Sequence, residues 1–221
     1  VGSEMCIRDS GGGRFDPGIL YYAPQGWTSD DTDAAERVKI QYGTSMCYPV
    51  SSMGSHVSVV PNHQLNRKTP LHTRANVAYF GTFGYELDLN KLSDEEISEV
   101  KQQITFMKEY RELIQFGTFY RLKSPFEGNE TAWMTVSEDK KTALVFWYRE
   151  RNVVNADFTR VRLQGLDPDL IYRNEYNETE NYGDELMNLG LLTTDCTAGE
   201  PTSEDEPCTD YESRIYVLTA K

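Results

Sequence analysis

The feature that most constrains the fold is a change of pattern close to Gly117. Before this residue, apolar side chains recur at helical spacing and long loops separate the periodic stretches. After it, short runs rich in Val, Ile, Thr, Tyr and Trp alternate with turn-forming residues, which is typical of antiparallel strands. The 221 residues therefore predict two differently built parts, an α/β part followed by an all-β part.

The most clearly marked element is a helix predicted over residues 94–115. Ser93 and Glu96 form a capping box, in which serine is followed three residues later by glutamate. Gly117 follows as the stop signal. The other elements expected before Gly117 are helices at 31–42 and 71–80, a short strand at 84–89 and a long loop at 48–70.

Six short runs after Gly117 predict an antiparallel sheet domain, most simply a β-sandwich. A polar, acidic insertion at 193–210 separates the last two elements. The six predicted strands cover residues 118–122, 132–136, 143–148, 159–163, 171–176 and 214–218.

Charge and composition exclude several classes of function. The formal net charge is −13, and no stretch rich in Lys and Arg stands out, so binding to nucleic acid or to an anionic membrane surface is not expected. No apolar run is long enough to span a bilayer. No Cys and His spacing suits zinc, and His56 and His63 are interpreted as structural loop residues.

Two further sets of residues leave alternatives open. Cys196 and Cys208 flank the acidic insertion, and they would either pair in an oxidising compartment or remain surface thiols. Asn129 and Asn177 begin triplets that could accept a glycan in predicted turns, which matters only if the protein is secreted.

The stretch around Trp27 is the strongest candidate for chemistry. Asp30, Asp31 and Asp33 follow this ring and precede the helix expected at 31–42. An apolar ring can raise the pKa of a neighbouring carboxyl group, making it a general acid, and a sugar can stack on the same ring. The alternative is that Asp30 or Asp31 only caps the helix. The glycine-rich turn at 10–16 is either a ligand contact or a flexible end.

Several motifs follow one another in order from Ser10 to the C-terminus. They include Ser10-Gly11-Gly12-Gly13-Arg14-Phe15-Asp16, Tyr21-Tyr22-Ala23-Pro24-Gln25-Gly26-Trp27-Thr28-Ser29-Asp30-Asp31-Thr32-Asp33-Ala34, Gly54-Ser55-His56-Val57-Ser58, Pro61-Asn62-His63-Gln64, Phe80-Gly81-Thr82-Phe83-Gly84-Tyr85-Glu86-Leu87-Asp88 and Gly183-Asp184-Glu185-Leu186-Met187. Together, and in this colinear order, these motifs resemble the family-36 glycoside hydrolases, the α-galactosidases.

The resemblance implies the end of a larger architecture, in which a β-sandwich, a (β/α)₈ barrel and an antiparallel β-domain follow one another. Residues 11–116 then form the last units of the barrel, since a whole barrel needs about 250 residues. Residues 117–221 form the C-terminal β-domain. Residues 1–10 do not look like family sequence, and they are expected to be a non-native N-terminus.

The chemistry implied by the resemblance is retaining hydrolysis of terminal α-galactosides of the melibiose and raffinose type, without cofactor or metal. Asp30 is assigned as the acid/base, with Asp31 as the fallback. Ser10 and Gly11 are expected to contact the galactose, as is the ring of Trp27. The compartment and any homo-oligomer of the parent enzyme stay open.

Two departures from the family pattern limit what this chain does by itself. The nucleophile of the family lies in a lysine-tryptophan-aspartate stretch that is absent here, so the chain alone is expected to be inactive. Arg8 also stands where the family has a ligand-contacting cysteine. Two rival functions remain: a galactosyltransferase of the same clan, and a non-catalytic carbohydrate-binding β-domain in which Asp30 is only a cap.

Overall fold

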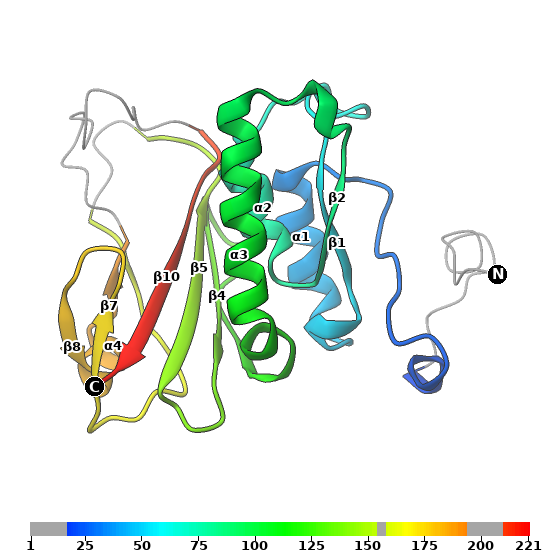
Figure 1. Cartoon of the computed structure of the whole chain (residues 1–221). Coiled ribbons are helices and arrows are strands. Elements are labelled where there is room, and N and C mark those ends of the chain that lie inside the picture. Colours follow the sequence, from blue (N-terminus) through cyan, green and yellow to red (C-terminus); the bar gives the residue numbers. More distant parts are fainter. Residues whose placement is uncertain (1–16, 154–157, 194–209) are drawn as a thin grey trace. The chain divides into compact units, whose positions relative to one another are not determined.

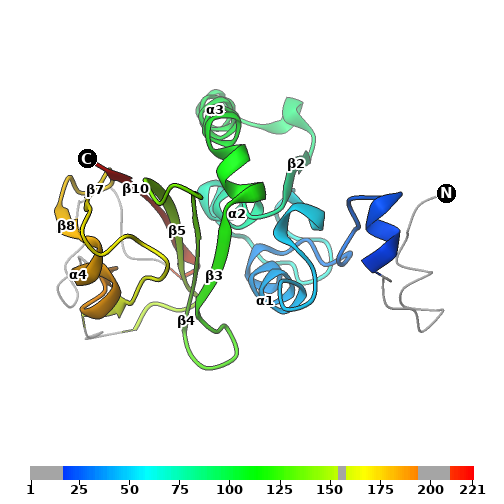
Figure 2. The same ribbon diagram turned by 90° about the horizontal axis from the view of Figure 1, so that it is seen from below.

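The computed structural model describes residues 17–153, 158–193 and 210–221, and it divides into two compact units between Gln115 and Phe116 (Figures 1 and 2). Ser10 and Gly11 lie outside the described residues, as do most of the insertion at 193–210 and both of its cysteines. No helix within the described ranges combines the length and the apolarity needed to cross a membrane.

The first unit contains parallel strands connected by helices. β1 (Gly54–Ser58) pairs in parallel with β2 (Thr82–Glu86), and α2 (Leu71–Ala78) lies between them in the chain. Gly26 forms a parallel bridge with Met53, and α1 (Ala34–Thr44) connects that bridge to β1. Three successive segments therefore run parallel with α1 and α2 as crossovers beside them (Figure 1), the arrangement of repeated βα units.

The loop predicted at 48–70 is wrong in its middle, because β1 lies there and is preceded by the 3₁₀ helix η3 (Val50–Ser52). In this strand Val57 is the one apolar residue with a side chain, so no alternation of apolar residues marks it. Its hydrogen-bonded partner β2 is what makes it a strand. The strand predicted at 84–89 begins two residues earlier, at Thr82, and ends at Glu86.

The helix starts agree with local signals in two of three cases. α2 begins at Leu71 as predicted. In α3 (Asp94–Phe116) both capping-box bonds form: the Ser93 backbone N–H donates to Glu96 Oε2 at 2.9 Å, and the Glu96 N–H donates to Ser93 Oγ at 3.2 Å. α1, by contrast, begins at Ala34 rather than at residue 31.

Asp33 is the residue that caps α1, so neither Asp30 nor Asp31 has the capping role considered above. Its Oδ2 accepts the Glu36 backbone N–H at 3.1 Å, and the same oxygen forms an ion pair with Arg67. The residue is only 2% exposed. Both interactions come from one carboxylate, so this side chain holds the helix start to the segment that follows β1.

Replacing Asp33 by alanine is therefore expected to lower the free energy of unfolding by about 2 kcal/mol, the upper end for a lost N-cap. Urea unfolding followed by circular dichroism measures this change. Glu36→Ala is the matched control, since Glu36 lies in the same turn and its ion pairs with Lys39 and Arg67 are longer, at 3.5 and 3.6 Å. If Glu36→Ala lowered the free energy of unfolding as much as Asp33→Ala, the N-cap would contribute no more than a partly exposed ion pair.

The second unit is built on a six-stranded sheet in which every neighbouring pair is antiparallel. The C-terminal strand lies in the middle, between strands that precede it by many residues. In sheet order the strands are β3 (Thr118–Lys123), β4 (Glu130–Val136), β5 (Thr142–Arg149), β10 (Glu212–Ala220), β7 (Ile171–Asn174) and β8 (Glu180–Tyr182).

A smaller layer covers one face of this sheet. It consists of the two-stranded sheet β6 (Arg160–Val161) and β9 (Leu191–Leu192), together with α4 (Gly183–Asn188). Figure 2 shows α4 on one side of the strands β7, β10 and β5. The predicted antiparallel domain is confirmed, but the run predicted at 159–163 contributes only the two residues of β6, and β8, β9 and α4 were not predicted.

The core of the second unit lies between these two layers. It contains the buried side chains Trp147, Tyr172 and Tyr216 from the large sheet and Leu186 from α4. Gly183 begins α4 where a Cβ atom would lie 1.9 Å from the Asp167 carbonyl oxygen. Only glycine therefore lets the start of α4 lie this close to the turn that precedes β7.

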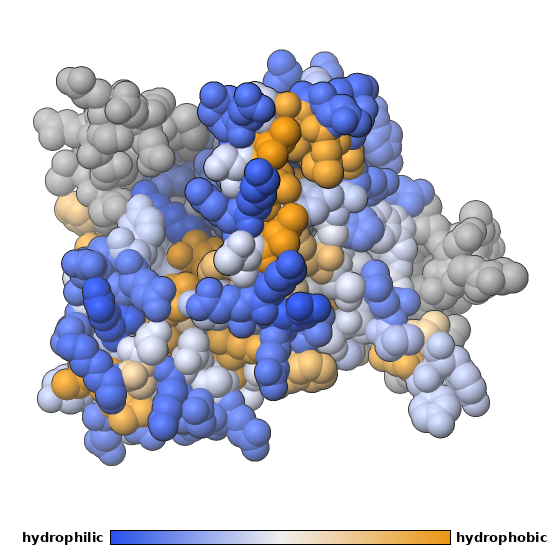
Figure 3. Space-filling view, in the orientation of Figure 1, coloured by the Kyte–Doolittle hydropathy of each residue, from blue (hydrophilic) through white to orange (hydrophobic). Residues whose placement is uncertain are grey.

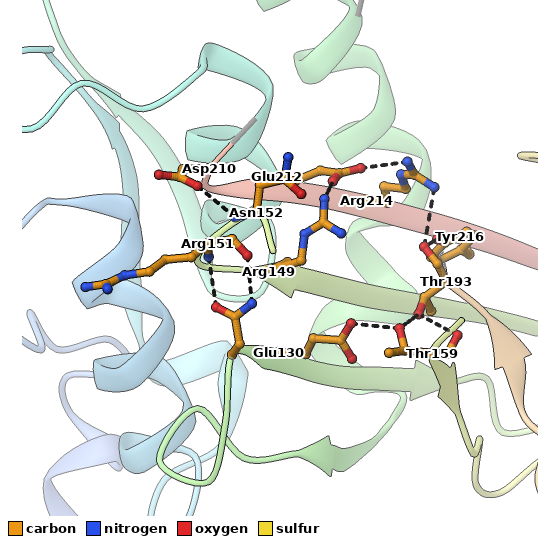
Figure 4. Close-up of polar contacts among 11 residues, drawn as sticks. Glu130, Arg149, Arg151, Asn152, Thr159, Thr193, Asp210, Glu212, Arg214 and Tyr216 are labelled. Carbon is orange, nitrogen blue, oxygen red and sulfur yellow. Dashed lines mark hydrogen bonds and ion pairs between the residues drawn. The ribbon is translucent and has the colours of Figure 1, made fainter. Parts of the chain in front are cut away.

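A group of polar contacts joins the ends of strands in the second unit (Figure 4). Glu212 pairs with Arg149 and accepts a bond from Arg214 at 2.6 Å. Arg214 also donates to the Thr193 carbonyl at 3.4 Å, and Thr159 donates to Glu130 at 2.7 Å. Since the charges of these groups balance one another, the arrangement is a structural tie between β4, β5, β10 and the segments beside them.

Hydrophobic side chains remain visible along α3 (Figure 3). Of its apolar residues, Val100, Met107 and Ile114 are buried, whereas Ile104 is 36% exposed. The helix therefore has an apolar stripe wider than its fully buried face.

Candidate functional site

The candidate site lies where two parallel segments of the first unit end. Two backbone bonds hold Gly26 to the start of β1: its N–H donates to the Ser52 carbonyl at 2.8 Å, and its carbonyl accepts the Gly54 N–H at 2.9 Å. Residues 27–31 follow at the carboxyl end of this segment. In parallel α/β folds the carboxyl ends of the strands carry the functional side chains, so this loop stands where a site is expected.

The loop after β1 lies against the same residues. Ser58 Oγ donates to the Thr32 carbonyl at 2.8 Å, and Asn62 Nδ2 donates to Thr32 Oγ1 at 3.3 Å. Gln64 Nε2 reaches the Asp30 carbonyl at 3.5 Å. Segments about thirty residues apart in the chain therefore form one surface around Asp30.

Trp27 and Asp30 are in direct contact. The indole Nε1–H donates to Asp30 Oδ1 at 3.0 Å, and the Asp30 side chain is exposed. Within the part of the chain that the structure describes, no hydrogen bond reaches the other oxygen of this carboxylate. The indole therefore orients this carboxylate through one of its two oxygens.

Asp31 has a different environment, although it is the adjacent residue. It is half-buried, and its Oδ1 accepts the Asp33 backbone N–H at 3.0 Å. Its own N–H donates to Ser29 Oγ at 3.1 Å. These bonds shape the turn before α1, so of the three aspartates Asp30 contacts the indole, Asp31 forms the turn and Asp33 caps the helix.

Arg37 lies beneath this loop and was missed by sequence reasoning. It is 3% exposed, and its guanidinium donates to Thr28 Oγ1 at 2.7 Å and to the Gly54 carbonyl at 2.6 Å. Its Cζ atom lies 5.7 Å from the centre of the Trp27 ring. The feature that could have indicated it is its spacing: Arg37 lies one turn before Gln41, on the same buried face of α1.

His56 also packs against the Trp27 ring. It lies on β1 rather than in a loop, which corrects the expectation for this residue, and the two ring centres are 4.7 Å apart. Its Nδ1 is 3.7 Å from Glu86 Oε2 on β2. At Gly84, a Cβ atom would lie 2.9 Å from His56 Cδ2, so a bare backbone makes room for the imidazole.

Burial lowers the pKa of His56. The carboxylate of Glu86 acts in the opposite direction, and the positive charge of Arg37 adds to the lowering. With an ordinary pKa of about 6.5, the imidazole is therefore neutral at neutral pH. Trp27 is therefore in contact with a neutral imidazole and with a charged guanidinium.

Within the described ranges, no three His, Cys, Asp or Glu side chains are grouped so that they could hold a metal ion. His63 is exposed in the loop after β1, and His72 is exposed on α2. Among the residues that the structure describes, it therefore brings together Trp27, Asp30 and His56 but no ligand set. Ser10 and Gly11, the other predicted contacts with a sugar, lie outside the described residues.

Two family models match this chain. The model described as Melibiase matches residues 1–117, and the model of the glycosyl hydrolase family 36 C-terminal domain matches residues 130–218. The boundary between the matches lies close to the division between the two units.

Curated relatives are α-galactosidases of much greater length. The chain is 58% identical over 188 residues to the α-galactosidase AgaA of Geobacillus stearothermophilus, covering 85% of this chain and 25% of the relative. It is 53% identical to the α-galactosidase Mel36A of Lactobacillus acidophilus, again covering 85% and 25%. The chain thus spans about a quarter of the length of these relatives.

Solved structures show the same relationship. The crystal structure of AgaA superposes with a TM-score of 0.86 and 51% sequence identity, covering 95% of this chain and 28% of that one. The galactosidase domain of AgaSK, a bifunctional α-galactosidase and sucrose kinase of Mediterraneibacter gnavus, gives a TM-score of 0.85 with 44% identity, covering 98% and 30%. With both of its parts matched, the chain belongs to glycoside hydrolase family 36, the family of these α-galactosidases.

Proposed function

We propose that the protein containing this chain hydrolyses terminal α-galactosides of the melibiose and raffinose type, with retention of configuration and with Asp30 as the acid/base. The observation that carries the proposal is the Asp30 carboxylate on the Trp27 indole, in a loop at the carboxyl end of a parallel segment. The membership of the family supports it, because the relatives that match this chain are α-galactosidases.

We assign the two parts of the chain to successive pieces of the parent. Residues 11–116 would be the last units of a (β/α)₈ barrel, which is supported by three parallel segments joined by helices. Residues 117–221 would be the C-terminal β-domain, supported by the six-stranded antiparallel sheet.

In the proposed mechanism, Asp30 protonates the oxygen of the departing sugar while a second carboxylate attacks the anomeric carbon. Asp30 then removes a proton from the water that releases galactose. The second carboxylate would come from an earlier barrel strand of the parent. Asp31 is the fallback for the acid/base role, although its bond to the Asp33 N–H favours a part in shaping the turn.

The substrate class follows from the relatives and from the ring of Trp27. Structures of AgaA variants hold raffinose and stachyose, and both are α-galactosides. Trp27 is only half-buried, and the part of its indole that stays exposed beside the acid is proposed to contact the galactose ring. Ser10 and Gly11 are proposed to contact the same sugar.

A chimera tests the proposal. This chain from Gly11 onward replaces the matching quarter of AgaA, and turnover of melibiose, raffinose and nitrophenyl α-galactoside is measured. We expect turnover by the chimera and none by the 221-residue chain alone, because retaining hydrolysis needs two carboxylates. A folded chimera without turnover would refute the proposal, as would turnover by the chain alone. Galactose passed to a sugar instead of water would favour the galactosyltransferase.

A further inference from the structure

We propose that Arg37 is a positioning residue for the acid/base, which holds the loop of residues 27–31 in the geometry that aims Asp30. The inference rests on the proposed function for its catalytic consequence. Its structural part, that Arg37 sets the position of this loop, stands on the contacts of Arg37 alone.

Arg37 donates hydrogen bonds both to the loop of residues 27–31 and to β1. One terminal nitrogen donates to Thr28 Oγ1 at 2.7 Å and approaches the Ser29 carbonyl at 3.5 Å. The other donates to the Gly54 carbonyl of β1 at 2.6 Å. The planar fork of a guanidinium fixes the angle between such acceptors, so Arg37 ties the loop to β1 in one orientation.

These bonds hold the two residues that connect Trp27 to Asp30. Thr28 and Ser29 lie between Trp27 and Asp30 in the chain, so anchoring them fixes the backbone between the indole and the carboxylate. The indole in turn binds Asp30 Oδ1 at 3.0 Å. A displacement of the loop would therefore shift the Asp30 carboxylate in two ways, by moving its backbone and by moving the indole that binds it.

The Trp27 ring also has little freedom on its other sides. Arg37 lies over the ring, and the His56 ring is 4.7 Å away. At Gly54 a Cβ atom would come within 2.9 Å of Trp27 Cε3, so the ring packs directly on the backbone of β1. Removing Arg37 would remove the support on one side of this stack.

Gln41 shows what a purely structural anchor on the same helix looks like. It is also 3% exposed, and it donates to the carbonyls of Val77 and Phe80 at 2.9 and 3.1 Å while accepting the Ser55 hydroxyl. These contacts attach α1 to the region of α2 and β1. None of these contacts is to a residue of the loop at 27–31, so Gln41→Met is the matched control for Arg37→Met.

The structural part is tested on the 221-residue chain by hydrogen–deuterium exchange. In Arg37→Met, exchange of the amides at 26–32 should rise about tenfold relative to exchange in α1. In Gln41→Met this ratio should stay at the wild-type value even if α1 loosens. Arg37→Lys keeps the positive charge but not the planar guanidinium, so its exchange ratio should lie between those of the two methionine variants. An equal ratio in both methionine variants would overturn the inference.

The catalytic part is tested in the AgaA chimera with two leaving groups. Arg37→Met should reduce kcat on a substrate with a poor leaving group by about a hundredfold, the cost of misplacing a reacting group by about 1 Å. The loss should be much smaller with a dinitrophenyl leaving group, which departs without a proton, and KM should change little. Gln41→Met should lower kcat by the same factor with the poor leaving group and with the dinitrophenyl leaving group.

The two measurements separate the possible failures. If kcat depended on the leaving group in the same way in Arg37→Met and Gln41→Met, Arg37 would have only a structural role, like that of Gln41. An exchange contrast in the chain combined with an inactive wild-type chimera would confirm that Arg37 positions the loop and would refute the proposed hydrolysis.

Discussion

Replacing Asp30 by asparagine in the AgaA chimera should reduce turnover of raffinose by about 10²–10⁴-fold, the usual contribution of general acid–base catalysis. Asparagine has the same shape and can keep the contact with Trp27 Nε1, but it cannot supply a proton. The loss should be much smaller with a dinitrophenyl galactoside, because an activated phenolate leaves without protonation. Steady-state kcat/KM values over a series of leaving groups measure this dependence.

Azide provides an independent check of the same role. A small anion can replace the water that has lost its base, so azide should restore the deglycosylation step of Asp30→Asn and produce a galactosyl azide. Asp31→Asn is the matched variant, and it should weaken the turn before α1 without showing any dependence on the leaving group. The reverse pattern would move the acid/base to Asp31, and no dependence in either variant would refute the assignment.

Replacing Trp147 by alanine should lower the free energy of unfolding of the second unit by about 3–5 kcal/mol, the range for large aromatic residues in a core. Trp147 is fully buried in the central strand β5, and the guanidiniums of Arg149 and Arg214 lie 5.6 and 5.7 Å from its ring. The variant therefore loses both core volume and two cation–π contacts.

Urea unfolding followed by circular dichroism measures this loss. Tyr182→Ala is the control, because Tyr182 is 52% exposed on the edge strand β8 of the same sheet, and exposed positions usually change stability by no more than about 0.5 kcal/mol. Similar costs for the two variants would mean that the region between the sheet and α4 is not the core of this unit.

Elements with complete local signals were predictable. The helix at 94–115 carries its own capping box, and both bonds between Ser93 and Glu96 form. The strands at 132–136 and 143–148 carry long β-branched and aromatic runs and appear as β4 and β5. In the helix the capping bonds lie within one turn, and in the two strands the residue types alone mark the element, because nearly every side chain is buried.

β1 and the start of α1 were not predictable in the same way. The five residues of β1 include two serines, a glycine and a histidine, and they become a strand because β2 pairs with them. For α1, Asp30, Asp31 and Asp33 are equivalent capping candidates by type. Asp33 is selected because Arg67, 34 residues away, lies where it can pair with that carboxylate.

The sequence by itself determined the family, the change from α/β to all-β pattern near Gly117, and the choice of an aspartate beside Trp27 as the candidate acid. Only the tertiary structure decided which aspartate contacts the indole and which residues hold that indole in place. Arg37 and His56 reach Trp27 from a helix and from β1, across 10 and 29 residues of chain. Such contacts depend on how segments pack in space, and no periodicity within either segment records them.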